Sequence, residues 1–218
     1  MKYTKRANGR QVQTLESMHG SNALIETLCE KTGKIFLMHH TSCIDPGAFI
    51  GESTKIWHYT HIMAGAIIGD HVNIGQGVMV ADGAIVGDGC KIQNNVSIYN
   101  GVTIGKNTFL GPSCVFTNVR FPRANVNQKD KFQKTIVGNN VTIGANATLV
   151  CGITIADDAF IAAGAVITED VSQGDIVAGV PARQIGHVND RNWTLKHKVL
   201  STLSDIEPAI WEDDLAES

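Results

Sequence analysis

The chain has 218 residues, 43% of them hydrophobic and 18% charged, so one domain of this length can bury a sizeable core. Its net charge of −3 gives no electrostatic case for nucleic acid or an acidic membrane as partner. We find no apolar run long enough to span a bilayer, and residues 1–13 are too polar and basic for a signal peptide, so we expect a cytoplasmic protein.

The N-terminal segment 1–37 differs from the rest of the chain and is predicted to be an extension. Apolar residues within Thr14–Lys31 recur at a weakly helical spacing, which Gly20 and Ser21 interrupt. This pattern predicts one or two short helices or a loosely ordered lead-in. The apolar run from Ile35 to Met38 could form a strand that caps the open end of the following structure.

A six-residue repeat dominates the middle of the chain. A unit this short fits one strand and one tight turn, with the apolar residue pointing inward and Gly, Asn or Asp supplying the turn. Three units per triangular coil predict an all-β fold, a parallel β-helix, whereas a sandwich would need strands roughly 8–12 residues apart. The first thirteen apolar positions are Ile44, Ile50, Ile56, Ile62, Ile68, Ile74, Val80, Val86, Ile92, Ile98, Ile104, Leu110 and Phe116.

Polar residues form columns if three repeats make one coil, because residues 18 apart then stack. One predicted column holds His58, Gln76, Asn94 and Pro112, and its neighbour holds Ala64, Asp82, Asn100 and Asn118. Polar side chains where a solenoid could use Gly or Ala favour a ligand site. An Asn ladder that satisfies the backbone of the turns is the open alternative.

The repeat breaks after Phe116, and we expect residues 122–136 to form a loop extruded from one corner of the β-helix. Long irregular loops in a compact domain are usually functional. Cations in and beside this loop could give a positive rim for phosphates or an ordinary solvated face: Arg120, Arg123, Lys129, Lys131 and Lys134. The repeat then resumes at Val137, Ile143, Leu149, Ile155, Ile161 and Ile167.

The β-helix domain is expected to span 38–187, with a helical cap and an acidic tail over 188–218. Its last coils are rich in Ala and Gly, which leave backbone accessible to an extended ligand. The five cysteines, in the order Cys29, Cys43, Cys90, Cys114 and Cys151, are widely spaced without a CxxC. We predict small buried side chains there rather than disulfides or a metal site.

Four stretches carry a family resemblance: KIQNNVSIYNGVTI (91–104), GPSCVFTNV (111–119), TIGANATLVCGITI (142–155) and AGVPARQIG (178–186). Across roughly residues 38–187 the chain resembles the left-handed parallel β-helix acyltransferases. Within them it is similar to the bacterial 3-N-acetyltransferases of UDP-2-acetamido-3-amino-2,3-dideoxyglucuronate and of dTDP-3-amino-3,6-dideoxyhexoses. The resemblance implies acetyl transfer from acetyl-CoA to a nucleotide-linked amino sugar, for surface polysaccharide or lipopolysaccharide synthesis. It also implies a homotrimer, with acetyl-CoA between neighbouring copies and no metal.

The same resemblance implies roles for individual residues. The cofactor would contact the backbone of Ala145, Ala162 and Ala163, with Val180, Pro181 and Arg183 near its adenine and phosphate end. The acceptor sugar would meet Asn94, Asn95, Tyr99, Asn118, Arg123 and His58.

The chemistry of amine acylation sets modest demands on a base, because a sugar amine is substantially unprotonated near neutral pH. Asn94 or Asn95 could orient the amine, although an amide cannot act as a base. His58 and His61 are the candidate general bases, with His61 expected at a corner. Their alternative role is structural, with the rings packed against Trp57 and Tyr59.

Three other functions stay open. The same fold could use a different acceptor or a longer acyl-CoA. It could be a metal-dependent hydratase resembling the γ-class carbonic anhydrases, which needs three convergent imidazoles where the close pair is only His58 and His61. Finally, the chain could be a catalytically silent scaffold, which would not bind acetyl-CoA.

Overall fold

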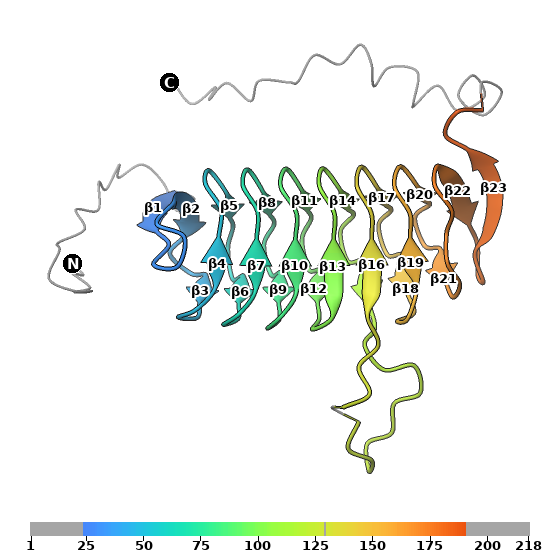
Figure 1. The fold of residues 1–218 in the computed structure, drawn as a ribbon, viewed down its shortest axis with the longest axis horizontal. Helices are drawn as coiled ribbons and strands as arrows, with labels where there is room; N and C mark the ends of the chain where they lie inside the picture. The colour runs from blue at the N-terminus through green and yellow to red at the C-terminus, as the bar shows by residue number, and fades with distance from the viewer. Residues whose placement is uncertain (1–23, 129, 191–218) are drawn as a thin grey trace, which may run out of the picture.

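The computed structural model describes residues 24–128 and 130–190, which form a long rod of short strands wound into stacked coils (Figure 1). Successive strands pass from sheet I to sheet II to sheet III and back to sheet I, one coil further along the rod. Neighbouring coils pair in parallel, for example Lys91 with Phe109, 18 residues apart. The all-β parallel β-helix predicted from the repeat is therefore confirmed.

The three sheets form the three sides of the rod. Sheet I contains β1 (Leu24–Leu28), β2 (Ile35–His39), β5 (Lys55–Ile56), β8 (Asn73–Ile74), β11 (Lys91–Ile92), β14 (Phe109–Leu110), β17 (Thr142–Ile143), β20 (Phe160–Ile161), β22 (Asp175–Ala178) and β23 (Arg183–His187). Sheet II contains β3 (Cys43–Ile44), β6 (His61–Ile62), β9 (Met79–Val80), β12 (Ser97–Ile98), β15 (Val115–Phe116), β18 (Thr148–Leu149) and β21 (Val166–Ile167). Sheet III contains β4 (Phe49–Ile50), β7 (Ile67–Ile68), β10 (Ile85–Val86), β13 (Val102–Ile104), β16 (Thr135–Val137) and β19 (Thr154–Ile155).

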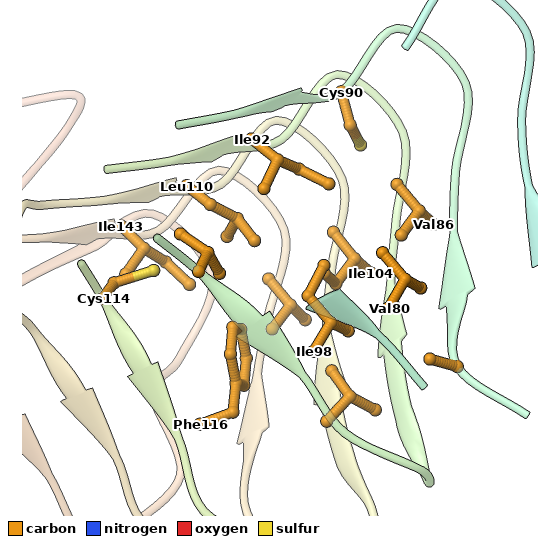
Figure 2. Packing of buried hydrophobic residues seen from close by; sticks show 14 of the residues in the cluster. Val80, Val86, Cys90, Ile92, Ile98, Ile104, Leu110, Cys114, Phe116 and Ile143 are labelled. Carbon is orange, nitrogen blue, oxygen red and sulfur yellow. The ribbon is translucent and has the colours of Figure 1, made fainter. Parts of the chain in front are cut away.

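Each repeat places one side chain outside and the next inside, because strand residues alternate between faces. In β11, Lys91 is exposed and Ile92 is buried. Every predicted inward position is buried except Ile44, which is half-buried near the first coil. Figure 2 shows the labelled aliphatic side chains, with Phe116 and two cysteines, filling the space between the sheets.

Tight stacking of the coils explains the glycines that often follow an inward residue. A Cβ built on Gly87 would lie 2.7 Å from the backbone carbonyl carbon of Gly105 in the next coil. Real Cβ atoms do not approach backbone so closely, so any side chain there would push the two coils apart.

The N-terminal part of the described rod is a hairpin, so residues 24–31 do not form the short helix that was one of the two expectations for Thr14–Lys31. Strand β1 pairs antiparallel with β2, and the residues of that segment before Leu24 lie outside the described part of the chain. Pairing of all five β1 residues with β2 overrides the weak helical spacing. The capping strand at Ile35–Met38 is confirmed, since β2 also pairs in parallel with β5. The expected domain boundary at residue 38 therefore falls inside β2.

A loop of residues 117–134 leaves the corner between sheets II and III, as Figure 1 shows. Thr135 and Ile136, which the sequence placed in this loop, belong to β16. At the base of the loop the Gln133 N–H donates to the Asn118 carbonyl over 3.0 Å. Pairing of Val102 with Thr135 then resumes the coil in register.

The far end of the rod is closed by β22 and the antiparallel β23. The predicted helical cap and acidic tail beyond Asp190 lie outside the described residues. Within the described ranges, no helix has the length and apolar character needed to cross a bilayer.

Candidate functional site

The corner between sheets I and II carries the predicted column of His58, Gln76, Asn94 and Pro112. Backbone hydrogen bonds connect it coil by coil: Gly77 N–H donates to the His58 carbonyl and Ser113 N–H to the Asn94 carbonyl, both over 2.9 Å. The predicted stacking is therefore confirmed. Beyond the loop insertion the same column continues into Ala145 and Ala163. Two of the expected acceptor residues, His58 and Asn94, thus share one line along the rod with two of the expected cofactor residues, Ala145 and Ala163.

A cavity of about 360 Å³ lies over the part of this corner that carries His58, Gln76 and Asn94, which we call the polar half. Its lining combines an indole, an imidazole and several amides, with Trp57 Nε1–H donating to Asn73 Oδ1 over 2.8 Å. This composition suits a polar ligand bearing many hydroxyl or amine groups. The lining residues are Trp57, His58, Asn73, Gly75, Gln76, Ile92, Gln93 and Asn94.

Asn94 already holds part of the turn, as the ladder alternative proposed. Its Oδ1 accepts the Gln76 backbone N–H over 3.0 Å. An amide oxygen has a second lone pair and the Nδ2 group remains a donor, so both can still address a ligand in the cavity. Asn95 has a φ of 62°, in the left-handed region that Asn tolerates, so its backbone forms the turn itself.

His58 stacks on His39, which the sequence did not pair with it. The ring centroids lie 3.6 Å apart at an interplanar angle of 27°, while Trp57 lies 6.4 Å away. His39 is 1% exposed and its Nδ1 hydrogen-bonds to Thr41 Oγ1 over 2.8 Å. In the described part of the chain the His58 ring nitrogens have no hydrogen-bond partner. His58 is thus a rigidly supported imidazole at the cavity wall, free to address a ligand.

The expectation that His61 emerges at a corner is wrong. His61 is the outward residue of β6, on the flat side of sheet II, and its Nε2 lies 3.2 Å from Asp45 Oδ1. The residue before an inward position occupies a strand, and only the residues after it enter the turn. His61 is not among the residues that line the cavity beside His58.

The structure places Tyr99, Asn118 and Arg123 away from this cavity. Tyr99 is half-buried against the core at the corner between sheets II and III. Asn118 begins the extruded loop, and Arg123 is exposed within it, donating to the Pro122 carbonyl. Among the loop cations, Lys129 lies outside the described residues.

The turn Gly179–Ala182 closes the small-residue end of sheet II. It pairs with β21, because Val166 N–H donates to the Gly179 carbonyl and Ala182 N–H donates to the Val166 carbonyl. Val180 is 73% exposed, and Arg183 Nη1–H donates to the Ala182 carbonyl. The predicted residues Val180, Pro181 and Arg183 therefore lie beyond Ala163 at the end of the rod.

The two halves of the sheet I/II corner differ in how the turn N–H groups are capped. In the polar half the side chain of Asn94 caps Gln76, and at the sheet III/I corner Asp70 and Asp88 cap the preceding coil in the same way. In the other half Pro112 and Ala163 have no side-chain acceptor to offer. Within the described residues, the backbone N–H groups of Asn94, Ala145 and Ala163 have no hydrogen-bond partner, and neither has that of His58 at the other end of the column.

Two family models match parts of this chain. Residues 47–82 match the model of the bacterial transferase hexapeptide (six repeats), and residues 76–177 match the GMPPB C-terminal domain. Each of these two matches covers less than half of the chain, and they overlap over residues 76–82.

Individual relatives match part of this hexapeptide-repeat chain. A 2,3,4,5-tetrahydropyridine-2,6-dicarboxylate N-acetyltransferase of Staphylococcus aureus (strain bovine RF122 / ET3-1) is 35% identical over 95 residues, 44% of this chain and 37% of that protein. The galactoside O-acetyltransferase of Escherichia coli (strain K12) is 37% identical over 92 residues, 40% of this chain and 45% of that protein. The alignments thus span less than half the length of these relatives.

Among solved structures, an S84A mutant of AntD, an N-acyltransferase from Bacillus cereus, has a similar fold with a TM-score of 0.50. It was solved in complex with dTDP-4-amino-4,6-dideoxyglucose and coenzyme A. The alignment covers 78% of this chain and 91% of AntD at 16% identity, a similarity that concerns the fold alone.

Proposed function

We propose that this chain is an N-acetyltransferase that moves the acetyl group of acetyl-CoA to the 3-amino group of a nucleotide-linked amino sugar. One observation carries the proposal. A cavity of imidazole and amide groups and a row of uncapped N–H groups lie on the same corner of the rod. The curated relatives, one named an N-acetyltransferase and one an O-acetyltransferase, support acetyl transfer as the reaction class.

The row of uncapped N–H groups of Asn94, Ala145 and Ala163 is the proposed binding site of acetyl-CoA, which we call the donor track. The pantetheine arm of coenzyme A carries amide carbonyls, which can accept hydrogen bonds from the free N–H groups of Ala145 and Ala163. Their methyl side chains let an extended ligand approach the backbone closely. Strands stack at about 4.8 Å per coil, so Asn94 and Ala163, three coils apart, are separated by roughly 14 Å along the rod.

The cavity at the sheet I/II corner is the proposed binding site of the acceptor amino sugar. The amine lone pair attacks the thioester carbonyl carbon, and the tetrahedral intermediate expels the thiolate of coenzyme A. The Asn94 N–H, at the junction of the cavity and the track, is the candidate donor to the oxyanion. His58 can take the proton that the amine loses, since its ring lines the cavity without another polar partner. Positioning of well-oriented reactants can alone supply about 7–11 kcal/mol.

The remaining predicted contacts require a second copy of the chain. Tyr99, Asn118 and Arg123 belong to the corner that borders sheets II and III, so a neighbouring copy would have to bring them to the cavity. An apolar ladder on the outer side of sheet III supports such an assembly, which we take to be the predicted homotrimer. Its exposed members are Phe49, Ile67, Ile85 and Ile136, with Thr103 between the last two.

Several finer predictions stay predictions: a role in surface polysaccharide synthesis, the cytoplasmic location, and acetyl transfer without a metal. The identity of the nucleotide, UDP or dTDP, also follows only from the resemblance.

The test is acetyl transfer by the purified chain. Acetyl-CoA is mixed with UDP- and dTDP-linked 3-amino sugars, with 4-amino sugars, and with the matching 3-hydroxy sugars. Released thiol is followed by a colour reagent and the product by mass spectrometry.

We expect thiol release and an acetylated product with a 3-amino sugar only. Acetylation of the hydroxy sugars, or activity only with a longer acyl-CoA, would favour the alternative acceptor or donor. Thiol release with none of these compounds contradicts the proposal.

A further inference from the structure

Cys43 is the exposed member of five free cysteines, which all lie in described residues. Cysteine is among the most frequently buried residue types, and Cys29, Cys90, Cys114 and Cys151 are buried here as the sequence predicted. Burial raises the pKa of the Cys114 thiol to about 12, which keeps that thiol protonated. The prediction of a buried small side chain is wrong for Cys43, because it occupies the outward position of β3.

Two potential ligands lie beside this thiol on the outer side of sheet II. His61 is the register partner of Cys43 in the next coil. Asp45 follows the inward residue Ile44, so it returns to the same outer side as Cys43. The Cys43 Sγ lies 3.9 Å from Asp45 Oδ1, which in turn lies 3.2 Å from His61 Nε2. The three donor atoms all lie within 4.8 Å of one another.

We propose that Cys43, Asp45 and His61 bind a divalent metal ion of the zinc class, with a fourth position open to water. Thiolate, imidazole and carboxylate are the ligands zinc takes, at about 2.0–2.3 Å. Ligands of a tetrahedral ion at those lengths lie about 3.2–3.8 Å apart, close to two of the spacings observed here. A thiolate ligand disfavours calcium and magnesium, which prefer oxygen.

The surroundings leave room for the open position. Cys43 and Asp45 line a cavity of about 390 Å³ beneath the N-terminal hairpin, and the side chains of His61 and Asp45 are 44% and 35% exposed. A plain surface ion pair of His61 with Asp45 would not need the neighbouring thiol. The metal site goes beyond the proposed acetyl transfer and lies on the flat side of sheet II, away from the cavity that His58 lines.

The test uses the full chain, stripped with a chelator and titrated with Co²⁺, whose absorption reports its ligands. We expect one ion per chain, the strong visible bands of a tetrahedral site, a sulfur-to-cobalt charge-transfer band, and displacement by Zn²⁺. The Cys43→Ala variant should lose the charge-transfer band and bind at least about tenfold more weakly. His61→Gln and Asp45→Asn should also weaken binding at least about tenfold.

The matched control is His71→Asn. His71 is an exposed histidine outside the cluster, and its φ of 56° is one that Asn tolerates. This variant should bind Co²⁺ like the parent chain. A weak octahedral spectrum, or unchanged binding by Cys43→Ala, overturns the proposal. Acetyl transfer measured in parallel should be the same for Cys43→Ala as for the parent, so failure of the metal site and failure of the proposed function are distinguishable.

Discussion

The Asn94 side chain both caps a turn and lines the candidate ligand cavity. Its oxygen caps the Gln76 N–H, and the residue also lines the cavity at the sheet I/II corner. Asn139 does the same structural work at the sheet III/I corner, where its Oδ1 accepts the Lys106 N–H over 2.8 Å. Asn139 therefore serves as a comparison that separates turn capping by Asn94 from its proposed role in acetyl transfer.

We predict that Asn94→Ala lowers the free energy of unfolding by about 1 kcal/mol, because it removes one exposed cap. Asn139→Ala should lower it by at least as much, because the Asn139 Nδ2 group also donates to the Asp157 carboxylate. Only Asn94→Ala should also lower kcat/KM, by about ten- to a hundredfold, since it removes an amide from the acceptor cavity. Thermal melts and steady-state kinetics on both variants check this. Equal activity of the two variants would show that Asn94 acts in the turn alone.

At the scale of a single coil, the glycines that directly follow inward residues allow neighbouring coils to stack closely. Gly87 has no room for a Cβ against Gly105, whereas a Cβ on Gly164 would meet nothing within 4 Å. We predict that Gly87→Ala lowers the free energy of unfolding by about 1–3 kcal/mol through overpacking. Gly164→Asn, placed at a φ of 70° that Asn tolerates, should cost much less. Urea unfolding of both variants is the measurement, and equal losses would contradict the steric explanation.

The sheet III/I corner carries its own charge ladder. The Lys106 ammonium bonded to Asp88, together with the Asp70 N–H, lowers the pKa of the Asp88 carboxyl. A carboxyl whose pKa is lower when folded stabilises the fold above its unfolded pKa of about 3.9, and this stabilisation disappears as pH falls through the folded value.

We therefore predict that Asp88→Asn lowers Tm at pH 7, and that the difference from the parent chain closes as the pH falls below the unfolded carboxyl pKa of about 3.9 and through the lower folded pKa. Asn can keep the hydrogen bond to the Asp70 N–H, as Asn139 keeps the equivalent one, so mainly the ion pair is lost. Melting curves from pH 7 to pH 2 measure the effect. A Tm difference that stays constant over this range would mean that the ion pair contributes nothing.

The sequence predicted the coils well because one inward residue in six specifies both the strand and its register. It predicted the column of His58, Gln76 and Asn94 for the same reason. It missed the His39–His58 stack, since the two are 19 residues apart and β2 lies outside the repeat. It also misplaced His61, because the strand position was counted as a corner, and it missed the exposure of Cys43, which composition alone does not reveal.

At the scale of the whole rod, the apolar ladder on sheet III is the surface that an assembly would bury. Phe49, Ile67 and Ile85 are 39%, 43% and 38% exposed, one above another in successive coils. Monomeric proteins rarely expose a continuous apolar stripe of this kind.

We predict that Ile85→Lys converts the assembled protein to monomers and removes acetyl transfer, because the cavity would lose the residues supplied by the neighbouring copy. Lys91→Glu, on the outer side of sheet I, should change neither property. Light scattering coupled to size exclusion reports the mass. A parent chain that already elutes as a monomer, or an Ile85→Lys variant that remains assembled, would contradict the predicted trimer.

The insertion of residues 117–134 leaves the rod on both sides of it undisturbed, since Leu110 still pairs with Ile143 and Phe116 with Leu149. Corners of such a rod can therefore gain or lose segments without any change to the aliphatic interior. Substrate choice can in this way evolve, or be engineered, by exchanging a corner segment between relatives, while the stability of the scaffold and the donor track are inherited unchanged.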